Sequence, residues 1–357
     1  MDFEPSDDRR MLADSLGRWL ADAYPVSHRN AVAYAAPFHD PARWAGLAEL
    51  GVLHALVPEA RGGFGGAGFD VLTVFEALGR ALCPEPVLPA LLAARVLMAA
   101  GADLEPLMAG EVRYALAAGE PEAPWDLGAT QADAARDGEG WRLTGRKSVV
   151  YGGPAAHRIL VVARDGDALS VFEVEAGDAG RSDYGLIDGG GASDLFLEGT
   201  AARLVLPDAG GDVEDALDWG RLALCAEAVG AMDAAKEMTI DYLRTRKQFG
   251  RPIGSFQALQ HRAVELVAQI EQARSITILA ASAMGAPEQS RSVSMAKNLV
   301  GRATQLAAEE SVQMQGGIAM TWEYPGSHYA KRLTMIDAQL GDADFHLARV
   351  MSALQAA

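Results

Sequence analysis

A basic segment late in the chain carries side chains suited to binding an anion. It reads Arg244-Thr245-Arg246-Lys247-Gln248-Phe249-Gly250-Arg251-Pro252-Ile253-Gly254. The segment ends a long stretch of helical periodicity and leads into a Gly/Pro turn. Three or four cations in one turn favour an anion, and a guanidinium can bind a phosphate through two hydrogen bonds. A ligand that carries a pyrophosphate fits this pattern. Charge complementarity at a helix C-terminus is the alternative interpretation.

A second segment combines glutamines with paired glycines just after a predicted helix. It reads Gln313-Met314-Gln315-Gly316-Gly317-Ile318-Ala319-Met320-Thr321-Trp322-Glu323-Tyr324-Pro325. Two glycines let a backbone approach a ligand closely, and a glutamine offers both a donor and an acceptor. The segment is therefore a second candidate for ligand binding. A helix C-cap followed by a turn is the alternative interpretation.

The glycine-rich run and the two cysteines are weaker candidates for ligand binding or catalysis. The glycine-rich run at residues 62–68 resembles a nucleotide-binding loop, but it does not join a convincing strand to a helix with an acid about twenty residues later. A flexible loop is the favoured interpretation. Cys83 and Cys225 lack the spacing of a zinc site, which argues against a metal, a disulfide framework and a Cys–His nucleophile. We expect both to be buried small hydrophobic residues.

The composition excludes several classes of function. The 357 residues include 31 Lys+Arg and 48 Asp+Glu, which gives a net charge of −17. A nucleic acid or an anionic membrane would be repelled on average. The first residues contain no apolar segment of a signal peptide, and no stretch of eighteen uncharged apolar residues occurs. We therefore expect a soluble, cytoplasmic protein.

The order of patterns along the chain predicts helices, then a β-domain, then a helical bundle. Helical periodicity covers residues 7–110. From residue 113 to 207, short β-forming runs alternate with Asp-Gly or Gly-rich turns, which predicts an antiparallel β-domain. Long helical periodicity then returns, and short loops favour antiparallel neighbours. One of its apolar faces comprises Met295, Leu299, Ala303 and Leu306. The expected domains are residues 1–111, 112–210 and 211–357.

Together these segments resemble the acyl-CoA dehydrogenase family of flavoproteins. The resemblance covers essentially the whole chain: Glu49-Leu50-Gly51-Val52 with the following Gly-rich loop, the β-domain, Arg244 to His261, and Gln313 to Pro325. It implies an α+β fold with an N-terminal helical domain, a middle antiparallel β-domain and a C-terminal four-helix bundle, assembled as dimers or tetramers. It also implies residues that would contact an FAD bound mainly by the adjacent subunit: Arg246, Gln248, Phe249, Gln313, Gly316 and Gly317.

The family's reaction removes two hydrogens from an acyl-CoA. A carboxylate takes the α-proton while the β-hydrogen passes as a hydride to the flavin, and an electron-transfer flavoprotein then accepts the electrons. This resemblance makes a base indispensable. The two positions at which the family places that glutamate correspond here to Leu340 and Gly220.

The β-domain also departs from the family pattern. The family's T-E-P corresponds to Gly119-Glu120-Pro121, and its W-I-T-N strand corresponds to Val149-Val150-Tyr151-Gly152. An aromatic and two hydroxyl partners of the flavin ring are therefore missing or altered. The chain resembles the small, base-lacking subunits of heterotetrameric bacterial acyl-CoA dehydrogenases of the pimeloyl-CoA and steroid side-chain types. This resemblance implies an α2β2 assembly with a paralogous chain that carries the glutamate.

Two alternatives remain open. One is a self-sufficient homo-oligomer with a relocated base, for which Asp342, Asp344 and Glu227 are the candidates. The other is a non-catalytic scaffold subunit. Asp342 is also interpretable as a helix N-cap, and Glu227 as a buried, paired structural acid. His261 and His346 are expected to be structural or surface histidines.

Overall fold

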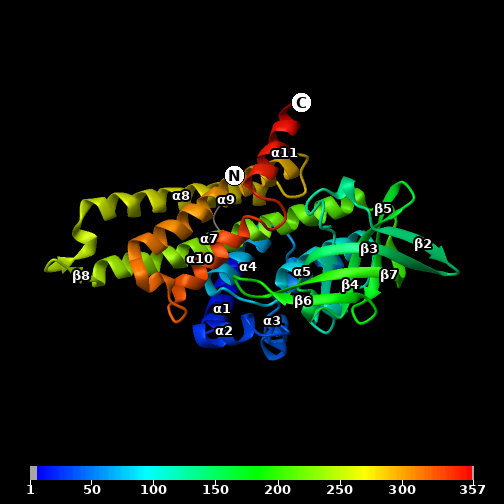
Figure 1. Cartoon of the computed structure of the whole chain (residues 1–357), viewed down its shortest axis with the longest axis horizontal. Helices are drawn as coiled ribbons and strands as arrows, with labels where there is room; N and C mark the ends of the chain where they lie inside the picture. The colour runs from blue at the N-terminus through cyan, green and yellow to red at the C-terminus, as the bar shows by residue number, and fades with distance from the viewer. Residues whose placement is uncertain (1–5, 356–357) are drawn as a thin grey trace. The chain divides into compact units, whose positions relative to one another are not determined.

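The chain folds as an N-terminal helical domain, a middle β domain and a C-terminal helical domain, which confirms the predicted fold class (Figure 1). The structure is a computed structural model that describes residues 6–355. Two compact units share the N-terminal helices: one contains residues 6–26, 67–83 and 221–355, and the other contains residues 27–66 and 84–220. The domain boundaries expected near residues 111 and 210 stay a prediction.

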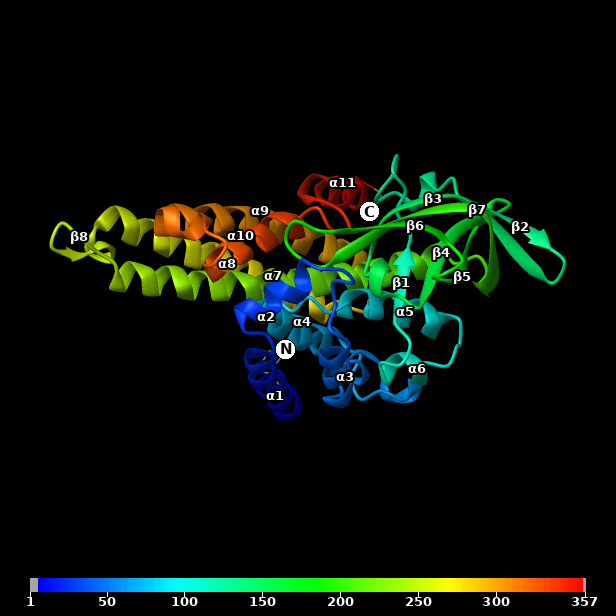
Figure 2. The same ribbon diagram turned by 60° about the horizontal axis from the view of Figure 1, so that its bottom comes forward.

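The described helices follow the predicted periodicity. They are α1 (Asp7–Ala23), α2 (Val26–Ala33), α3 (Pro41–Glu49), α4 (Gly68–Ala81), α5 (Val87–Ala99), α6 (Glu105–Met108), α7 (Gly210–Thr245), α8 (Gln257–Ser282), α9 (Gln289–Gln315), α10 (Pro325–Ile336) and α11 (Ala343–Gln355). Helices α7, α8 and α9 are the long elements of the bundle, and both ribbon views show them side by side (Figures 1 and 2). No helix in the described part of the chain is apolar over a length that would cross a membrane.

The β domain contains one mixed sheet. Its strands are β1 (Tyr114–Ala117), β2 (Asp133–Asp137), β3 (Gly140–Tyr151), β4 (Arg158–Asp165), β5 (Ala168–Glu175), β6 (Gly180–Gly185) and β7 (Gly191–Leu206). The order is β1-β4-β2-β3-β7-β5, β6 pairs with β7, and β4 also pairs with β5. Most pairs are antiparallel, as predicted, but β1 and β2 both run parallel to β4. A parallel pair needs a long connection, and the segment from β1 to β4, which contains β2 and β3, provides it.

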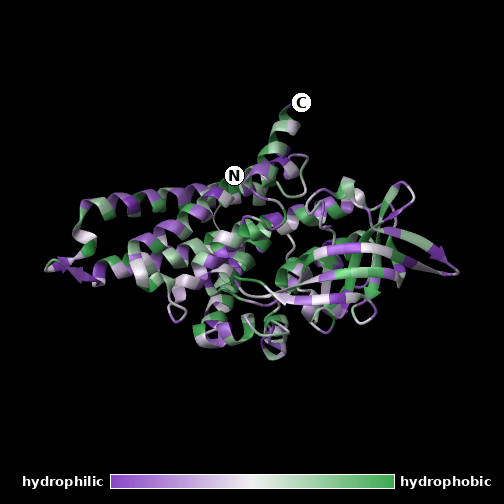
Figure 3. Cartoon of the chain, viewed as in Figure 1, coloured by the Kyte–Doolittle hydropathy of each residue, from purple (hydrophilic) through white to green (hydrophobic). Residues whose placement is uncertain are grey.

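Alternation along the strands sets the core of this sheet. Strands β3 and β7 alternate buried with exposed or half-buried residues over much of their length, whereas β4 is buried continuously from Ile159 to Ala163. Figure 3 shows the same change of hydropathy along the long strands. Gly138 and Gly166, in the two predicted Asp-Gly turns, have φ of 62° and 63°. Glycine adopts this left-handed backbone without a steric penalty, which explains the tight β2–β3 and β4–β5 connections.

Helix α4 packs against α7 through two glycines. A Cβ atom at Gly79 would lie 2.0 Å from the carbonyl oxygen of Glu227, and one at Gly230 would lie 2.0 Å from the carbonyl oxygen of Glu76. These distances leave no room for a methyl group. The glycines therefore set the separation of the two helices within this unit.

We predict that Gly79→Ala and Gly230→Ala each lower the free energy of unfolding. Each added methyl group would force the two helix backbones apart, and overpacking of this kind costs about 1–3 kcal/mol. Urea denaturation measures the change. Gly211→Ala is the control because a Cβ atom there meets nothing within 4 Å. Parent-like stability of both α4–α7 variants would contradict the proposed close contact.

Candidate cofactor-binding site

The basic segment forms a β-hairpin directly after α7. Strands β8 (Lys247–Gln248) and β9 (Arg251–Pro252) pair antiparallel. The turn residues Phe249 and Gly250 have φ of 53° and 78°. Positive φ at both positions is typical of the two-residue turn that matches the twist of paired strands. The hairpin therefore has a defined conformation beyond the helix end, where Figure 1 marks β8.

The predicted ligand-binding side chains of this hairpin are exposed. Phe249 is 90% exposed, and Arg246 and Gln248 are exposed as well. The Phe249 ring touches only the edge of Phe256, at 6.1 Å between ring centroids, among the ring contacts of the described residues. Because the ring is exposed, it contributes little hydrophobic stabilisation to the fold, and its left-handed backbone conformation destabilises the fold by about 1–2 kcal/mol. A ligand or another chain that covers the ring would offset both costs.

The second predicted segment lies where α9 meets α7. Gly316 ends α9 with φ 70°, so the C-cap interpretation describes its backbone correctly. The buried Gln315 amide donates to Thr239 Oγ1 on α7 at 2.6 Å. Thr239 precedes Arg246 by seven residues, or about 10 Å along a helix. Both predicted segments therefore lie toward the same end of the bundle.

The glycines of the second segment leave its backbone open. Gly316 and Gly317 are exposed, and a Cβ atom at either would meet nothing within 4 Å. Gln313 is exposed one turn earlier on α9. Packing within this chain does not require Gly317, whereas close approach of a ligand to the backbone would explain it. The exposed cations and the exposed glycine backbone at this end of the bundle fit a phosphate-bearing cofactor.

The position that the resemblance assigns to the base is fixed in this chain through its backbone. Leu340 has φ 56°, and its carbonyl accepts hydrogen bonds from Arg221 Nε at 3.0 Å and from His346 Nε2 at 3.1 Å. Arg221 and His346 are both buried. The Leu340 side chain has no atom that can take a proton. Gly220, at the other expected position, is a buried residue within α7 and has no side chain.

A buried lysine holds the start of the same segment. Lys297 Nζ on α9 donates to the carbonyls of Ile336 and Asp337 at 3.1 and 3.0 Å. Burial lowers the pKa of Lys297 to about 8. Burial also raises the pKa of Asp337, against the opposing charge of Lys297. These groups hold the segment between α10 and α11 from inside the bundle.

The candidate replacement bases have structural partners. Glu227 accepts from Arg332 Nε at 2.7 Å and Nη2 at 2.8 Å, so both carboxylate oxygens are engaged. Asp342 Oδ1 accepts from the Phe345 amide at 2.8 Å and caps α11. The N-cap interpretation of Asp342 and the pairing of Glu227 agree with these contacts, although Glu227 is half-buried rather than buried. Asp344 is exposed in the first turn of α11.

The β-domain leaves no room for a hydroxyl side chain at Gly119. A Cβ atom there would lie 2.7 Å from the Pro124 carbonyl oxygen. The neighbouring Glu120 is buried and accepts from Lys147 Nζ at 2.7 Å and from the Ala132 amide at 2.9 Å. Burial alone would raise the pKa of Glu120, but these hydrogen bonds outweigh it and lower the pKa. The packing of this loop therefore requires glycine at position 119, where the family pattern has threonine.

Val149 stands where the family pattern has an aromatic residue. It lies at an irregularity between β3 and β7, has φ 51°, and donates its amide to Asp194 Oδ1 at 3.0 Å. A β-branched residue rarely adopts this conformation. Tyr184 donates its hydroxyl to the same Asp194 oxygen at 3.0 Å. Burial and this contact raise the pKa of Tyr184 to about 12. Hydrogen bonds to Asp194 therefore fix the backbone at Val149, although the family's aromatic ring is absent.

The glycine-rich loop does not offer its amides to a nucleotide. The amides of Gly63, Gly65 and Gly66 donate to the carbonyls of Pro58, Val57 and Ala55. A phosphate loop needs such amides to point at the ligand. Residues 62–68 therefore do not form a nucleotide loop, which agrees with the preference for an ordinary loop. Three of their amides are hydrogen-bonded to the backbone of residues 55–58.

Sequence reasoning missed most of the polar interior of the bundle. The expected apolar face of α9 is only partly buried, because Met295 is 37% exposed while Lys297 is 2% exposed. A lysine inside an otherwise apolar pattern was the available signal. Cys225 is buried, as expected, but Cys83 is half-buried and follows α4. His261 is exposed on α8.

We predict that His346 makes stability fall as pH decreases. Burial lowers the pKa of its imidazole to about 2, whereas an unfolded histidine has a pKa of about 6.5. Between these values the unfolded chain takes up a proton that the folded chain refuses. From pH 6.5 to 5.5 this linkage removes about 1 kcal/mol.

Urea unfolding at the two pH values tests this linkage. His346→Gln should lose about 1 kcal/mol less than the parent over the interval. The exposed His261→Gln variant is the control and should keep the parent's pH dependence. Parallel curves for the parent and His346→Gln would contradict the assignment.

Two family models match the N-terminal and the C-terminal parts of the chain. Residues 6–103 match the model of the acyl-CoA dehydrogenase N-terminal domain, and residues 211–355 match that of the C-terminal domain. The acyl-CoA dehydrogenase IpdE2 of Mycobacterium tuberculosis is 31% identical over 330 residues, which cover 92% of this chain and 91% of IpdE2. IpdE2 of Mycolicibacterium smegmatis is 30% identical over 295 residues, which cover 82% of each chain.

Solved structures share the whole fold. The ChsE4-ChsE5 complex from Mycobacterium tuberculosis matches with a TM-score of 0.90 and 26% identity, covering 100% of both chains. The Tcur3481-Tcur3483 steroid ACAD matches with a TM-score of 0.90 and 28% identity, covering 98% of both chains. The chain therefore belongs to the acyl-CoA dehydrogenase family, whose members are oxidoreductases that act on CH–CH groups.

Proposed function

We propose that this chain is the base-lacking subunit of a heteromeric, FAD-dependent acyl-CoA dehydrogenase. A paralogous partner chain carries the catalytic glutamate in this proposal. The observation that carries it is Leu340, whose carbonyl is bound by Arg221 and His346 while its side chain offers no proton acceptor. The likeness to the ChsE4-ChsE5 complex supports an assembly of two related chains.

The cofactor contacts in this proposal come from the exposed end of the bundle. Arg246 would bind phosphate oxygens, and the open backbone at Gly316 and Gly317 would lie against the nucleotide. Phe249 would be covered in the same assembly. When bound, FAD supplies a hydride acceptor, and the partner's base takes the α-proton of the acyl-CoA. The residues proposed for this contact are Arg246, Gln248, Phe249, Gln313, Gly316 and Gly317.

The remaining parts of the proposal concern substrate, acceptor and location. The substrate class is an acyl-CoA thioester, and the likeness to a steroid ACAD favours a steroid side chain or another bulky acyl group. Electrons from the reduced flavin pass to an electron-transfer flavoprotein. The complex works in the cytoplasm.

We predict that Arg246→Ala lowers the FAD content of the complex with the partner chain. A hydrogen bond to a charged group contributes about 1.5–3 kcal/mol, so FAD affinity should fall roughly 10- to 100-fold. Flavin absorbance per complex after gel filtration measures the loss. Arg291→Ala, which removes an exposed arginine from the start of α9, should leave flavin content unchanged. Equal flavin content in both variants would contradict the phosphate contact.

We predict that Leu340→Glu does not make the isolated chain an acyl-CoA dehydrogenase. The variant regains a carboxylate, but the β-domain still lacks side chains for the flavin ring at Gly119 and Val149. Bleaching of flavin absorbance by an acyl-CoA, with the chain purified alone and with its partner, measures this. Flavin binding and turnover by the parent chain alone would overturn the divided-site proposal.

The two alternative functions give different results. A homo-oligomer with a relocated base would lose turnover, but keep FAD, in Glu227→Gln or Asp342→Asn. Because Glu227 pairs with Arg332, a melting curve must accompany the first variant. A scaffold subunit would give a complex whose flavin content does not depend on Arg246.

A further inference from the structure

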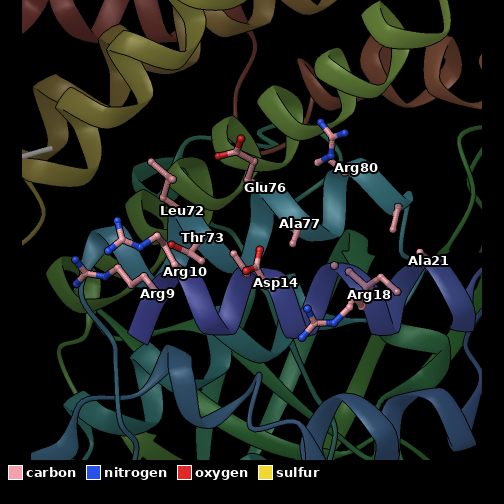
Figure 4. Close-up of a pocket in the computed structure, with 14 residues that line it drawn as sticks. Arg9, Arg10, Asp14, Arg18, Ala21, Leu72, Thr73, Glu76, Ala77 and Arg80 are labelled. Carbon is pink, nitrogen blue, oxygen red and sulfur yellow. The ribbon is translucent and has the colours of Figure 1, made fainter. Parts of the chain in front are cut away.

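Helices α1 and α4 enclose a groove that the proposed cofactor contacts do not use. Its volume is about 620 Å³, within the usual range for ligand and partner sites. Small residues line it on both helices, at Ala13, Gly17 and Ala21 of α1 and at Ala77 of α4. Figure 4 labels Ala21 and Ala77 among these lining residues. From Arg9 to Ala21 the lining follows α1 for about 18 Å.

Gly17 has no packing role within this chain. It lies inside α1 and is exposed, and a Cβ atom there would meet nothing within 4 Å. Glycine inside a helix costs about 1 kcal/mol relative to alanine. Gly79 and Gly230 are different, because neighbouring backbone excludes a methyl group at both. Close packing of two helices thus explains Gly79 and Gly230, and a helix of another protein that packs closely on α1 would explain Gly17 in the same way.

The charges of the groove alternate at the spacing of helical turns. Arg10, Asp14 and Arg18 follow one another at four-residue intervals on α1, and Glu76 and Arg80 do so on α4. Figure 4 places Arg10 toward one end, Arg18 and Arg80 toward the other, and Asp14 and Glu76 between them. Four residues of helix rise about 6 Å, so a helix lying along the groove can match each charge in turn.

Some of these charges already have partners, whereas others do not. Arg10 pairs with Asp7, Arg80 binds Glu237 at 2.7 Å, and Glu76 binds Arg274 at 2.7 Å. Arg9, also at the groove, binds Asp70 at 2.7 Å. Among residues 6–355, the side chains of Asp14 and Arg18 form no hydrogen bond or ion pair. Four arginines against two acids line the groove of a chain whose net charge is −17.

We propose that this groove docks an acidic amphipathic helix of a partner protein. The helix lays a narrow face of alanine or leucine side chains against Gly17, as in other helix-in-groove contacts. It places carboxylates opposite Arg10 and Arg18 and a cation opposite Asp14. The length of the groove and its turn-by-turn charges favour a helix over a compact small molecule. This inference does not depend on the proposed flavin contacts.

A fluorescent peptide titrated into the full-length chain tests the docking site. The probe is a helical peptide of about 15 residues, long enough to span the groove, with alanine and leucine on one face. Glutamate, lysine and glutamate follow at successive turns. The peptide should bind, and a charge-reversed peptide should bind at least tenfold more weakly. Equal anisotropy curves for the two peptides, or none for the acidic one, would overturn the proposal.

Substitutions in the groove give the matched comparison. Arg18→Glu and Gly17→Leu should each weaken the acidic peptide at least tenfold, whereas Arg291→Glu should not. Circular dichroism confirms that each variant is folded. Unchanged affinity in Gly17→Leu would place the peptide elsewhere. Direct binding of dodecanoate, measured by calorimetry, without any peptide binding would show a small anionic ligand instead, and would also overturn the helix proposal.

Gly17→Ala separates docking from folding. The added methyl group meets open space, so the variant should melt at a higher temperature than the parent while it binds the acidic peptide more weakly. A lower melting temperature would show that Gly17 serves the fold of this chain. The inference would then lose its basis.

Discussion

The hydrogen bond from Arg221 to the Leu340 carbonyl organises the part of the molecule on which the functional interpretation depends. It connects α7 to the segment between α10 and α11, where the family resemblance places a base. His346 binds the same carbonyl, and Lys297 binds two carbonyls nearer α10. Buried cations are costly unless they have acceptors. The segment and the cations therefore require each other.

This arrangement explains how a family member can lose its base and keep its fold. The contacts that fix the segment use backbone carbonyls, so they do not depend on which side chain stands at position 340. Glu227 and Asp342 are committed to Arg332 and to the start of α11. These two acids thus support structure. The exposed hairpin after α7 has the opposite character, because its side chains contribute little to this chain's own core.

The sequence predicted most of the fold because the patterns that specify it are local. Helical periodicity, β-forming runs and Asp-Gly turns gave the order of the elements, and the two turns at Gly138 and Gly166 formed as expected. The parallel pairing of β1 with β4 was not predictable, because strand order depends on contacts distant in sequence. The same limit hid the partners of Lys297, the carbonyls of Ile336 and Asp337, which lie 39 and 40 residues later in the chain.

The candidate site was predictable to the extent that its residues form contiguous motifs. Arg246 and Gln313 belong to such motifs, and both are exposed toward one end of the bundle. The groove between α1 and α4 escaped notice because its lining combines two helices separated by the segment 24–67. In the sequence of each helix alone, these charged residues are typical of an ordinary solvent-exposed face.

The two-residue turn at Phe249 and Gly250 has a thermodynamic consequence for assembly. A loop that becomes ordered only on association pays a conformational entropy penalty for each residue that it fixes. Here the paired strands already impose left-handed backbone at both turn positions before any other molecule arrives. Most of that penalty is met during folding, so a contact as small as one phenylalanine ring can contribute nearly all of its burial energy to association.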